Sequence, residues 1–244
     1  EKKQLAPGQP IIEAASGPFA TALTLASLTA GHPIVLVMPE DAPALRQEYL
    51  LRLGAQIRHS PARSGLAGAR ALAAQTAAVN GWYYMNWLAN DDNPEYHRRV
   101  TGPAIVQSIA RQNQSLVDAI TIGVGSAGTV TGVGETIKAW TNDVRIVAVE
   151  PYENQVLGGG LTGPHGIPDI GYGIVPENYN SYVVDNVSAV ASRDAQRAAQ
   201  QVLRTDAIPA SVSAGAALYA AAQLLANCNS RAALAIFSGR ASIV

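Results

Sequence analysis

The hydrophobic positions of the chain form short apolar runs that alternate with longer stretches of helical spacing. Residues 34–38 are continuously apolar and have the length of a strand buried on both faces. Residues 44–53 place leucines along one side of a predicted helix, and Gly54 follows as a stop signal. Residues 56–58 then predict a short strand, and the alanine-rich residues 65–79 predict a helix.

The second part of the chain repeats this alternation. The expected strands are 118–124, 144–149, 182–185 and 233–237. The expected helices are 94–112, broken or bent near Gly102-Pro103, then 129–140, 192–203 and 214–225. Residues 151–181 are rich in Gly, Pro, Tyr and Asn and predict a long loop region. The pattern favours an α/β architecture with mainly parallel twisted sheets flanked by helices, in two lobes, 1–92 and 93–244.

Composition narrows the classes of partner. The 17 basic and 18 acidic residues give a net charge of −1, so we expect no nucleic-acid partner and no membrane surface. The single Cys228 excludes an intrachain disulfide, and the four histidines show no metal-ligand spacing, so no metal site is predicted. The N-terminus is no secretory signal, which favours the cytoplasm. Only 14% of residues are charged, which favours an oligomer, expected to be a homodimer.

The sharpest local motif is the run Gly123-Val124-Gly125-Ser126-Ala127-Gly128-Thr129. It follows an apolar strand and opens a helix, so its backbone N–H groups can converge on a phosphate, with two hydroxyls nearby. A plain glycine-rich turn is the alternative. The same residues also satisfy the dinucleotide fingerprint, with Glu150 placed 22 residues after Gly128 as the ribose-binding acid.

Two further turns lie between a strand and a helix or open a helix. Residues 15–20, with Ser16-Gly17-Pro18 at their centre, can offer N–H groups to a carboxylate, or Ser16 can simply cap the helix. Residues 211–217 can aim a hydroxyl at a ring nitrogen of a ligand, or can form a capped helix with small residues for close packing.

Taken together, these segments resemble the cysteine synthase and cystathionine β-synthase family of pyridoxal-phosphate (PLP) enzymes, which have fold type II. The resemblance covers nearly the whole chain in the family's order and spacing. The matching segments are Pro7-Gly8, residues 11–13, Ser16-Gly17, residues 37–40, 53–55, 93–95, His97, 101–103, 123–132, 149–151, 163–165, 170–173 and 213–215.

The resemblance implies roles for residues that match the family's motifs. Gly125, Ser126, Ala127, Gly128 and Thr129 correspond to the loop that holds the cofactor phosphate. Ser213 corresponds to the residue hydrogen-bonded to the pyridine nitrogen, and Gly171 to the loop that closes over the substrate's amino group. A neutral hydroxyl at the pyridine nitrogen favours β-elimination and β-replacement over deeper carbanion chemistry.

Other positions depart from the family. Its Schiff-base lysine lies upstream of the counterpart of Glu1, and Lys2, Lys3 and Lys138 do not match it, so no catalytic residue is assigned and we expect N-terminally incomplete lobes. The family's substrate-carboxylate loop reads Ser-Gly-Asn-Thr-Gly, where this chain has Ser16, Gly17, Pro18, Phe19 and Ala20. A glutamine that contacts the same carboxylate falls at Trp87.

These observations lead to two functional expectations. The first is a PLP-dependent β-replacement or β-elimination enzyme that acts on an O-activated serine or a related small amino acid, with its lysine supplied from outside this chain. In that reading residues 1–92 form the substrate-side lobe and residues 93–244 the phosphate-binding lobe. The second is a non-catalytic relative that binds PLP, a metabolite or a protein partner.

Overall fold

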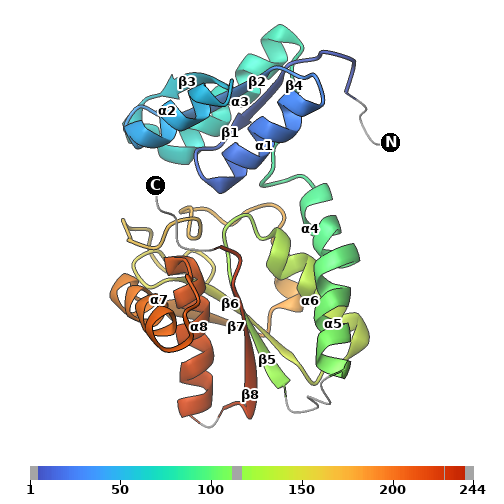
Figure 1. The fold of residues 1–244 in the computed structure, drawn as a ribbon, viewed down its shortest axis with the longest axis vertical. Coiled ribbons are helices and arrows are strands. Elements are labelled where there is room, and N and C mark those ends of the chain that lie inside the picture. The colour runs from blue at the N-terminus through green and yellow to red at the C-terminus, as the bar shows by residue number, and fades with distance from the viewer. Residues whose placement is uncertain (1–4, 112–116, 228, 240–244) are drawn as a thin grey trace. The chain divides into compact units, whose positions relative to one another are not determined.

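The structure is a computed structural model that describes residues 5–111, 117–227 and 229–239. The chain divides into two compact units between Trp87 and Leu88. Each unit contains a four-stranded parallel sheet with helices on both faces (Figure 1). The predicted two-lobed α/β class is therefore confirmed. Lys2, Lys3 and Cys228, which the sequence singled out, lie outside the described residues.

The first unit has the strand order β3-β2-β1-β4. Its elements are β1 (Ile11–Ala14), α1 (Pro18–Thr29), β2 (Ile34–Pro39), α2 (Ala44–Arg52), β3 (Gln56–Ser60), η1 (Ala62–Ser64), α3 (Gly65–Asn80) and β4 (Tyr83–Tyr84). Successive side chains of a strand point to opposite faces. Accordingly Ile34, Leu36 and Met38 pack in the core with α1 and α2, whereas Val35 and Val37 pack against α3.

The second unit has the strand order β7-β6-β5-β8. Its elements are α4 (Asp92–Tyr96), the π-helix η2 (His97–Thr101), α5 (Gly102–Arg111), β5 (Val117–Gly123), α6 (Gly128–Trp140), β6 (Arg145–Pro151), η3 (Ser181–Val183), β7 (Asn186–Val190), α7 (Ser192–Asp206), α8 (Val212–Ala226) and β8 (Ala232–Ile236). Helices α7 and α8 cover one face of this sheet, and α5 and α6 lie on the other (Figure 1). The loop between β5 and α6 therefore opens at the carboxyl edge of the sheet, where α/β proteins bind ligands.

One sequence expectation in this unit is wrong, and another is confirmed. The strand expected at 182–185 is wrong, because Asn180 accepts a hydrogen bond from the Tyr182 N–H at 3.1 Å and closes the turn η3 instead. Tyr182 is 98% exposed, so its apolar ring does not mark a buried strand position. The break expected near Gly102-Pro103 in the helix 94–112 is confirmed, because the π-helix η2 ends at Thr101 and α5 begins at Gly102; residue 112 lies outside the described residues. Pro103, which follows η2, has no N–H to continue an α-helical hydrogen-bond ladder.

Gly132 brings η2 and α4 into close contact with α6. A Cβ built on Gly132 meets the carbonyl oxygen of Pro94 and lies 2.6 Å from the Cβ of His97. Because a backbone atom cannot move aside alone, Gly132→Ala should lower the free energy of unfolding by about 2 kcal/mol in urea denaturation. Gly166→Ala, whose new Cβ would meet its first neighbour only at 3.4 Å, is the control. Equal stability of the two variants would contradict this packing.

Candidate functional site

The loop between β5 and α6 presents a row of backbone donors. Ala127 lies in the left-handed region with φ +64° and precedes the 13-residue helix α6. Within the described residues, the N–H groups of Gly125, Ser126, Ala127 and Thr129 have no hydrogen-bond acceptor. A residue other than glycine is strained in the left-handed region, and such strained residues are frequent at ligand-binding sites. Unpaired N–H groups at a helix N-terminus fit an anion such as phosphate.

The two hydroxyls of this loop are held from outside it. Ser126 Oγ accepts a hydrogen bond from Asn93 Nδ2 at 2.9 Å, and Thr129 Oγ1 lies 3.2 Å from His97 Nε2. Asn178 Nδ2 also donates to the Ser126 carbonyl at 3.4 Å. These contacts from outside the loop hold its two hydroxyls in place. A plain glycine-rich turn would not need such contacts.

Gly171 and Ser213 lie beside the same loop. The Gly171 N–H donates to the Val124 carbonyl at 3.1 Å, and the Gly171 carbonyl accepts from His165 Nε2 at 2.8 Å. A Cβ built on Gly123 would lie 3.7 Å from the Ser213 carbonyl oxygen, and the Ser213 hydroxyl is 3.0 Å from that of Ser211. The structure thus brings all seven predicted cofactor-binding residues to one edge of the second sheet.

The dinucleotide reading does not fit this structure. Its ribose-binding acid, Glu150, is 1% exposed, and its carboxylate accepts the N–H groups of Leu157 at 2.7 Å and Gly158 at 3.0 Å. Burial raises the pKa of Glu150, and these two hydrogen bonds oppose the shift. A carboxylate that is buried and hydrogen-bonded to its own backbone is not available to a ribose hydroxyl.

The predicted substrate residues lie in the first unit. Gly17 is the N-cap of α1 without a side-chain cap, so Ser16 does not cap this helix as the alternative reading expected. Phe19 and Trp87 stack on each other, with ring centroids 4.6 Å apart and an interplanar angle of 18°. The Trp87 indole N–H donates to the Ala14 carbonyl at 3.2 Å. The polar loop of the resembling family is replaced here by an aromatic pair.

A buried carboxylate accepts a hydrogen bond from the backbone of Trp87 and was missed by sequence reasoning. Glu13 is fully buried and accepts the N–H groups of Ala14 at 2.7 Å and Trp87 at 3.0 Å. Burial raises its pKa from 4.5 to about 7. Its position in the apolar strand β1, directly before the Ser16-Gly17 turn, was the only signal in the sequence.

Asn93 and His97 were likewise missed as members of the phosphate-loop neighbourhood. They are 33 and 32 residues from their partners in the chain, so local spacing carries no signal for these contacts. The matching spacing of Asn93/His97 and Gly128/Gly132, four residues in each case, is a signal that could have found them.

Lys138 cannot serve as the missing amine in this structure. Its Nζ pairs with Asp185 Oδ2 at 2.7 Å and donates to the Val144 carbonyl at 3.1 Å. Among the described residues there is no group of three or more His, Cys, Asp or Glu side chains suited to a metal ion. In that same part of the chain, no helix is both long and apolar enough to cross a membrane.

Comparisons with known proteins show the family of the chain. The family model described as "Pyridoxal-phosphate dependent enzyme" matches residues 1–239. A cysteine synthase of Staphylococcus aureus is 32% identical over 220 residues, covering 90% of this chain and 70% of the relative. The structure of O-acetyl serine sulfhydrylase isoform 3 from Entamoeba histolytica matches with a TM-score of 0.86 and 34% identity, covering 97% of this chain and 70% of that one.

A hydrogen sulfide-producing enzyme from Fusobacterium nucleatum matches with a TM-score of 0.91 and 27% identity, over 97% of this chain and 71% of that one. The sequence and fold matches span both units. The chain therefore belongs to the pyridoxal-phosphate dependent enzyme family, as a cysteine synthase-like member of fold type II.

Proposed function

We propose that this protein binds PLP in its second unit and catalyses β-replacement or β-elimination on an O-activated serine or a related amino acid. The observation that carries the proposal is the loop Gly125–Thr129, whose unpaired N–H groups and two hydroxyls lie beside Gly171 and Ser213. The cysteine synthase and sulfhydrylase relatives support the same reaction class. PLP, when bound, supplies the electron sink for chemistry at the amino acid's α-carbon.

Different residues of this chain then bind different parts of the cofactor. The N–H groups of the loop and the hydroxyls of Ser126 and Thr129 hold the phosphate by charge-assisted hydrogen bonds. Ser213, 5% exposed at the start of α8, offers a neutral hydroxyl to the ring nitrogen. Gly171 sits in the left-handed region with φ +65°, where its loop passes next to the phosphate loop through Val124.

The catalytic amine is proposed to come from outside the residues of this chain. Lys138 is the only lysine among the described residues, and it is paired with Asp185. The described residues are therefore assigned to binding, orientation and proton positioning. Residues 1–92 are proposed as the substrate-side lobe and residues 93–244 as the phosphate-binding lobe.

One observation favours a second candidate, a non-catalytic relative that binds PLP, a metabolite or a protein partner. The stack of Phe19 on Trp87 occupies the positions where the family has polar carboxylate ligands. An ionised carboxylate that loses its donors is costly to bury. Such a relative would keep the phosphate loop and lose turnover.

The cofactor assignment is tested by titrating the protein with PLP and, separately, with NAD. PLP should give a saturable change in coenzyme absorbance and in tryptophan fluorescence, whereas NAD should give none, because Glu150 is already hydrogen-bonded to Leu157 and Gly158. Saturable NAD binding without a PLP response would overturn the assignment. Turnover of an O-activated serine by the PLP-loaded protein then separates the enzyme from the non-catalytic relative.

The aromatic pair predicts poor binding of a small substrate. Pro18 and Phe19 replace two polar residues of the loop that, in the family, holds the substrate carboxylate and the cofactor's ring hydroxyl. Each lost hydrogen bond to a charged group contributes about 1.5–3 kcal/mol. The double variant Pro18→Asn, Phe19→Thr should therefore bind O-acetylserine about a hundredfold more tightly than the unmodified protein, by calorimetry. Phe19→Leu, which keeps the site apolar, is the control and should bring no gain. Equally tight binding by the unmodified protein would contradict this.

We also propose that the protein is a cytoplasmic homodimer. The low charge content supports association, and α1 and α2 expose Leu25, Leu45 and Leu51 to solvent at 49%, 68% and 53%. Sedimentation of the purified protein measures the mass of the assembly directly, and a monomer at micromolar concentration would contradict the dimer.

A further inference from the structure

Two side chains one helical turn apart hold the two hydroxyls of the phosphate loop. Asn93, on α4, donates from Nδ2 to Ser126 Oγ at 2.9 Å. His97, the first residue of η2, places Nε2 at 3.2 Å from Thr129 Oγ1. Both side chains reach the loop from the same helical segment, so their positions relative to the loop are set together.

Glycines on α6 make this approach possible. A Cβ on Gly128 would meet Asn93 Oδ1 and lie 2.5 Å from Asn93 Cγ, and a Cβ on Gly132 would lie 2.6 Å from the Cβ of His97. The bare backbone of α6 thus forms the surface on which both side chains lie. Any larger residue at either position displaces one of them.

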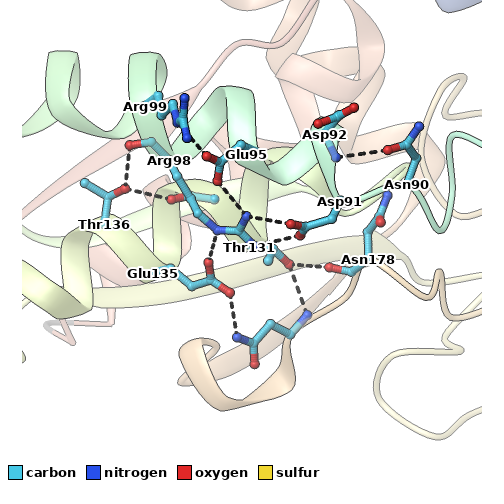
Figure 2. A network of polar contacts seen from close by, with 12 residues as sticks. Asn90, Asp91, Asp92, Glu95, Arg98, Arg99, Thr131, Glu135, Thr136 and Asn178 are labelled. Carbon is cyan, nitrogen blue, oxygen red and sulfur yellow. Dashed lines mark hydrogen bonds and ion pairs between the residues drawn. The ribbon is translucent and has the colours of Figure 1, made fainter. Parts of the chain in front are cut away.

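An ionic network keeps η2 against α6. Figure 2 shows Arg98 at its centre, where the guanidinium pairs with Asp91 at 3.0 Å, with Glu95 at 3.0 Å and with Glu135 of α6. Hydrogen bonds with Asp91 and Glu135 hold the pKa of Arg98 above its usual range. Arg98 directly follows His97 in the chain, so the network also restrains the histidine backbone.

The hydrogen bonds at Ser126 leave its proton free for a ligand. Ser126 Oγ accepts from Asn93 Nδ2 and, at 3.5 Å, from the Gly128 N–H. A hydroxyl has two acceptor lone pairs and one proton to donate. Both lone pairs are engaged, and no acceptor for the proton lies among the described residues. The hydroxyl proton is therefore available to a group that enters the loop.

The hydroxyl of Thr129 can likewise keep its proton for a ligand, depending on which nitrogen of His97 is protonated. The imidazole lies between Thr101 Oγ1, 2.9 Å from Nδ1, and Thr129 Oγ1, 3.2 Å from Nε2. Burial lowers the pKa of His97, which favours a neutral ring with one donor and one acceptor nitrogen. When His97 Nε2 carries the proton, Thr129 Oγ1 accepts a hydrogen bond from it. The hydroxyl proton of Thr129 then remains available to a ligand.

We propose that Asn93 and His97 are positioning residues that direct the hydroxyl protons of Ser126 and Thr129 toward the phosphate of the bound cofactor. The proposal rests on the proposed function, because it assigns the anion in the loop to that phosphate. It also selects the tautomer of His97 in which Nδ1 accepts from Thr101 and Nε2 donates to Thr129. The loop is then set for a phosphate before the ligand arrives.

Equilibrium binding of PLP and of inorganic phosphate tests the His97 half of the proposal. His97→Leu removes the donor to Thr129 and should weaken binding of both probes about tenfold or more. His97→Gln, which restores an N–H donor near the Nε2 position, should recover most of that loss. In a Thr129→Val background, His97→Leu should cause no further loss, because its effect passes through the threonine hydroxyl.

The Asn93 half is tested in the same way. Asn93→Leu should weaken PLP binding about tenfold in the unmodified protein and leave it unchanged in a Ser126→Ala background. Long-range proton–nitrogen NMR spectra of the protein saturated with phosphate should show His97 protonated at Nε2 and unprotonated at Nδ1. These spectra report the tautomer directly and do not depend on enzymatic activity or on the stability of a variant.

The outcomes separate the two levels of the argument. If the unmodified protein binds neither PLP nor phosphate, the proposed function fails, and the positioning proposal fails with it. If it binds both probes, but His97→Leu binds as tightly as the unmodified protein or loses as much affinity with Val at position 129, only the positioning proposal is overturned. Protonation of His97 at Nδ1 in the phosphate-saturated protein overturns it as well.

Discussion

Gly128→Asp should weaken PLP binding by several kcal/mol, about a thousandfold. The new Cβ would lie 2.5 Å from Asn93 Cγ and force that side chain away from Ser126, which removes the support of one hydroxyl. The carboxylate would also stand at the N-terminus of α6, where the unpaired N–H groups attract the phosphate. Like-charge repulsion and loss of the donor set then act together. Calorimetric titration with PLP measures the change.

Two matched variants show whether the effect belongs to the loop. Gly81→Asp adds the same charge at an exposed glycine with no atom within 4 Å of its new Cβ, in a left-handed position that Asp tolerates, and should leave PLP affinity unchanged. Ser126→Ala removes one hydrogen bond to a charged group and should cost about tenfold. PLP affinity that is the same in Gly128→Asp and in the unmodified protein would mean that the loop is only a turn.

The strands and helices of this chain could be predicted from the sequence where all residues of an element are buried. Residues 34–38 form a continuous apolar run because β2 is covered on both faces, and that run predicts the strand correctly. The turn η3 could not be read in the same way. There the hydrogen bond from the Tyr182 N–H to the Asn180 side chain determines the local structure. The apolar residues 182–184 have the sequence pattern of a strand but do not form one.

The loop Gly125–Thr129 could be located from the sequence because it is contiguous and its chemistry resides in backbone groups. Its supports could not, because Asn93 and His97 reach it across more than thirty residues through the bare backbone of α6. The stacking of Phe19 on Trp87 is similarly remote in sequence. Resemblance placed each ring at a substrate position, but only the structure pairs the two rings with each other.

Glu13 is the clearest case of a charge that tertiary structure places in an apolar setting. It lies in β1 between Ile12 and Ala14, and desolvation raises its pKa from 4.5 to about 7, against the N–H bonds from Trp87 and Ala14 and the charge of Arg70. Because Trp87 stacks on Phe19, the state of this carboxylate is linked to the aromatic pair through a single hydrogen bond.

The unfolding free energy should fall by about 3 kcal/mol between pH 4.5 and pH 7 through Glu13 alone. In this window the native carboxyl keeps a proton that the unfolded chain has already released, so the native state binds more protons and loses stability as the pH rises. Glu13→Gln cannot titrate, and its stability relative to the unmodified protein should therefore rise by that amount across the window and level off above pH 7.

Urea unfolding, followed by the fluorescence of Trp82 and Trp87, measures both proteins at each pH. Glu48→Gln, at an exposed residue of α2 paired with Arg52, controls for the removal of a carboxylate in the same unit. A stability difference between Glu13→Gln and the unmodified protein that stays constant with pH would mean that the pKa of Glu13 is the same in the native and unfolded states, with its N–H donors offsetting the cost of burial.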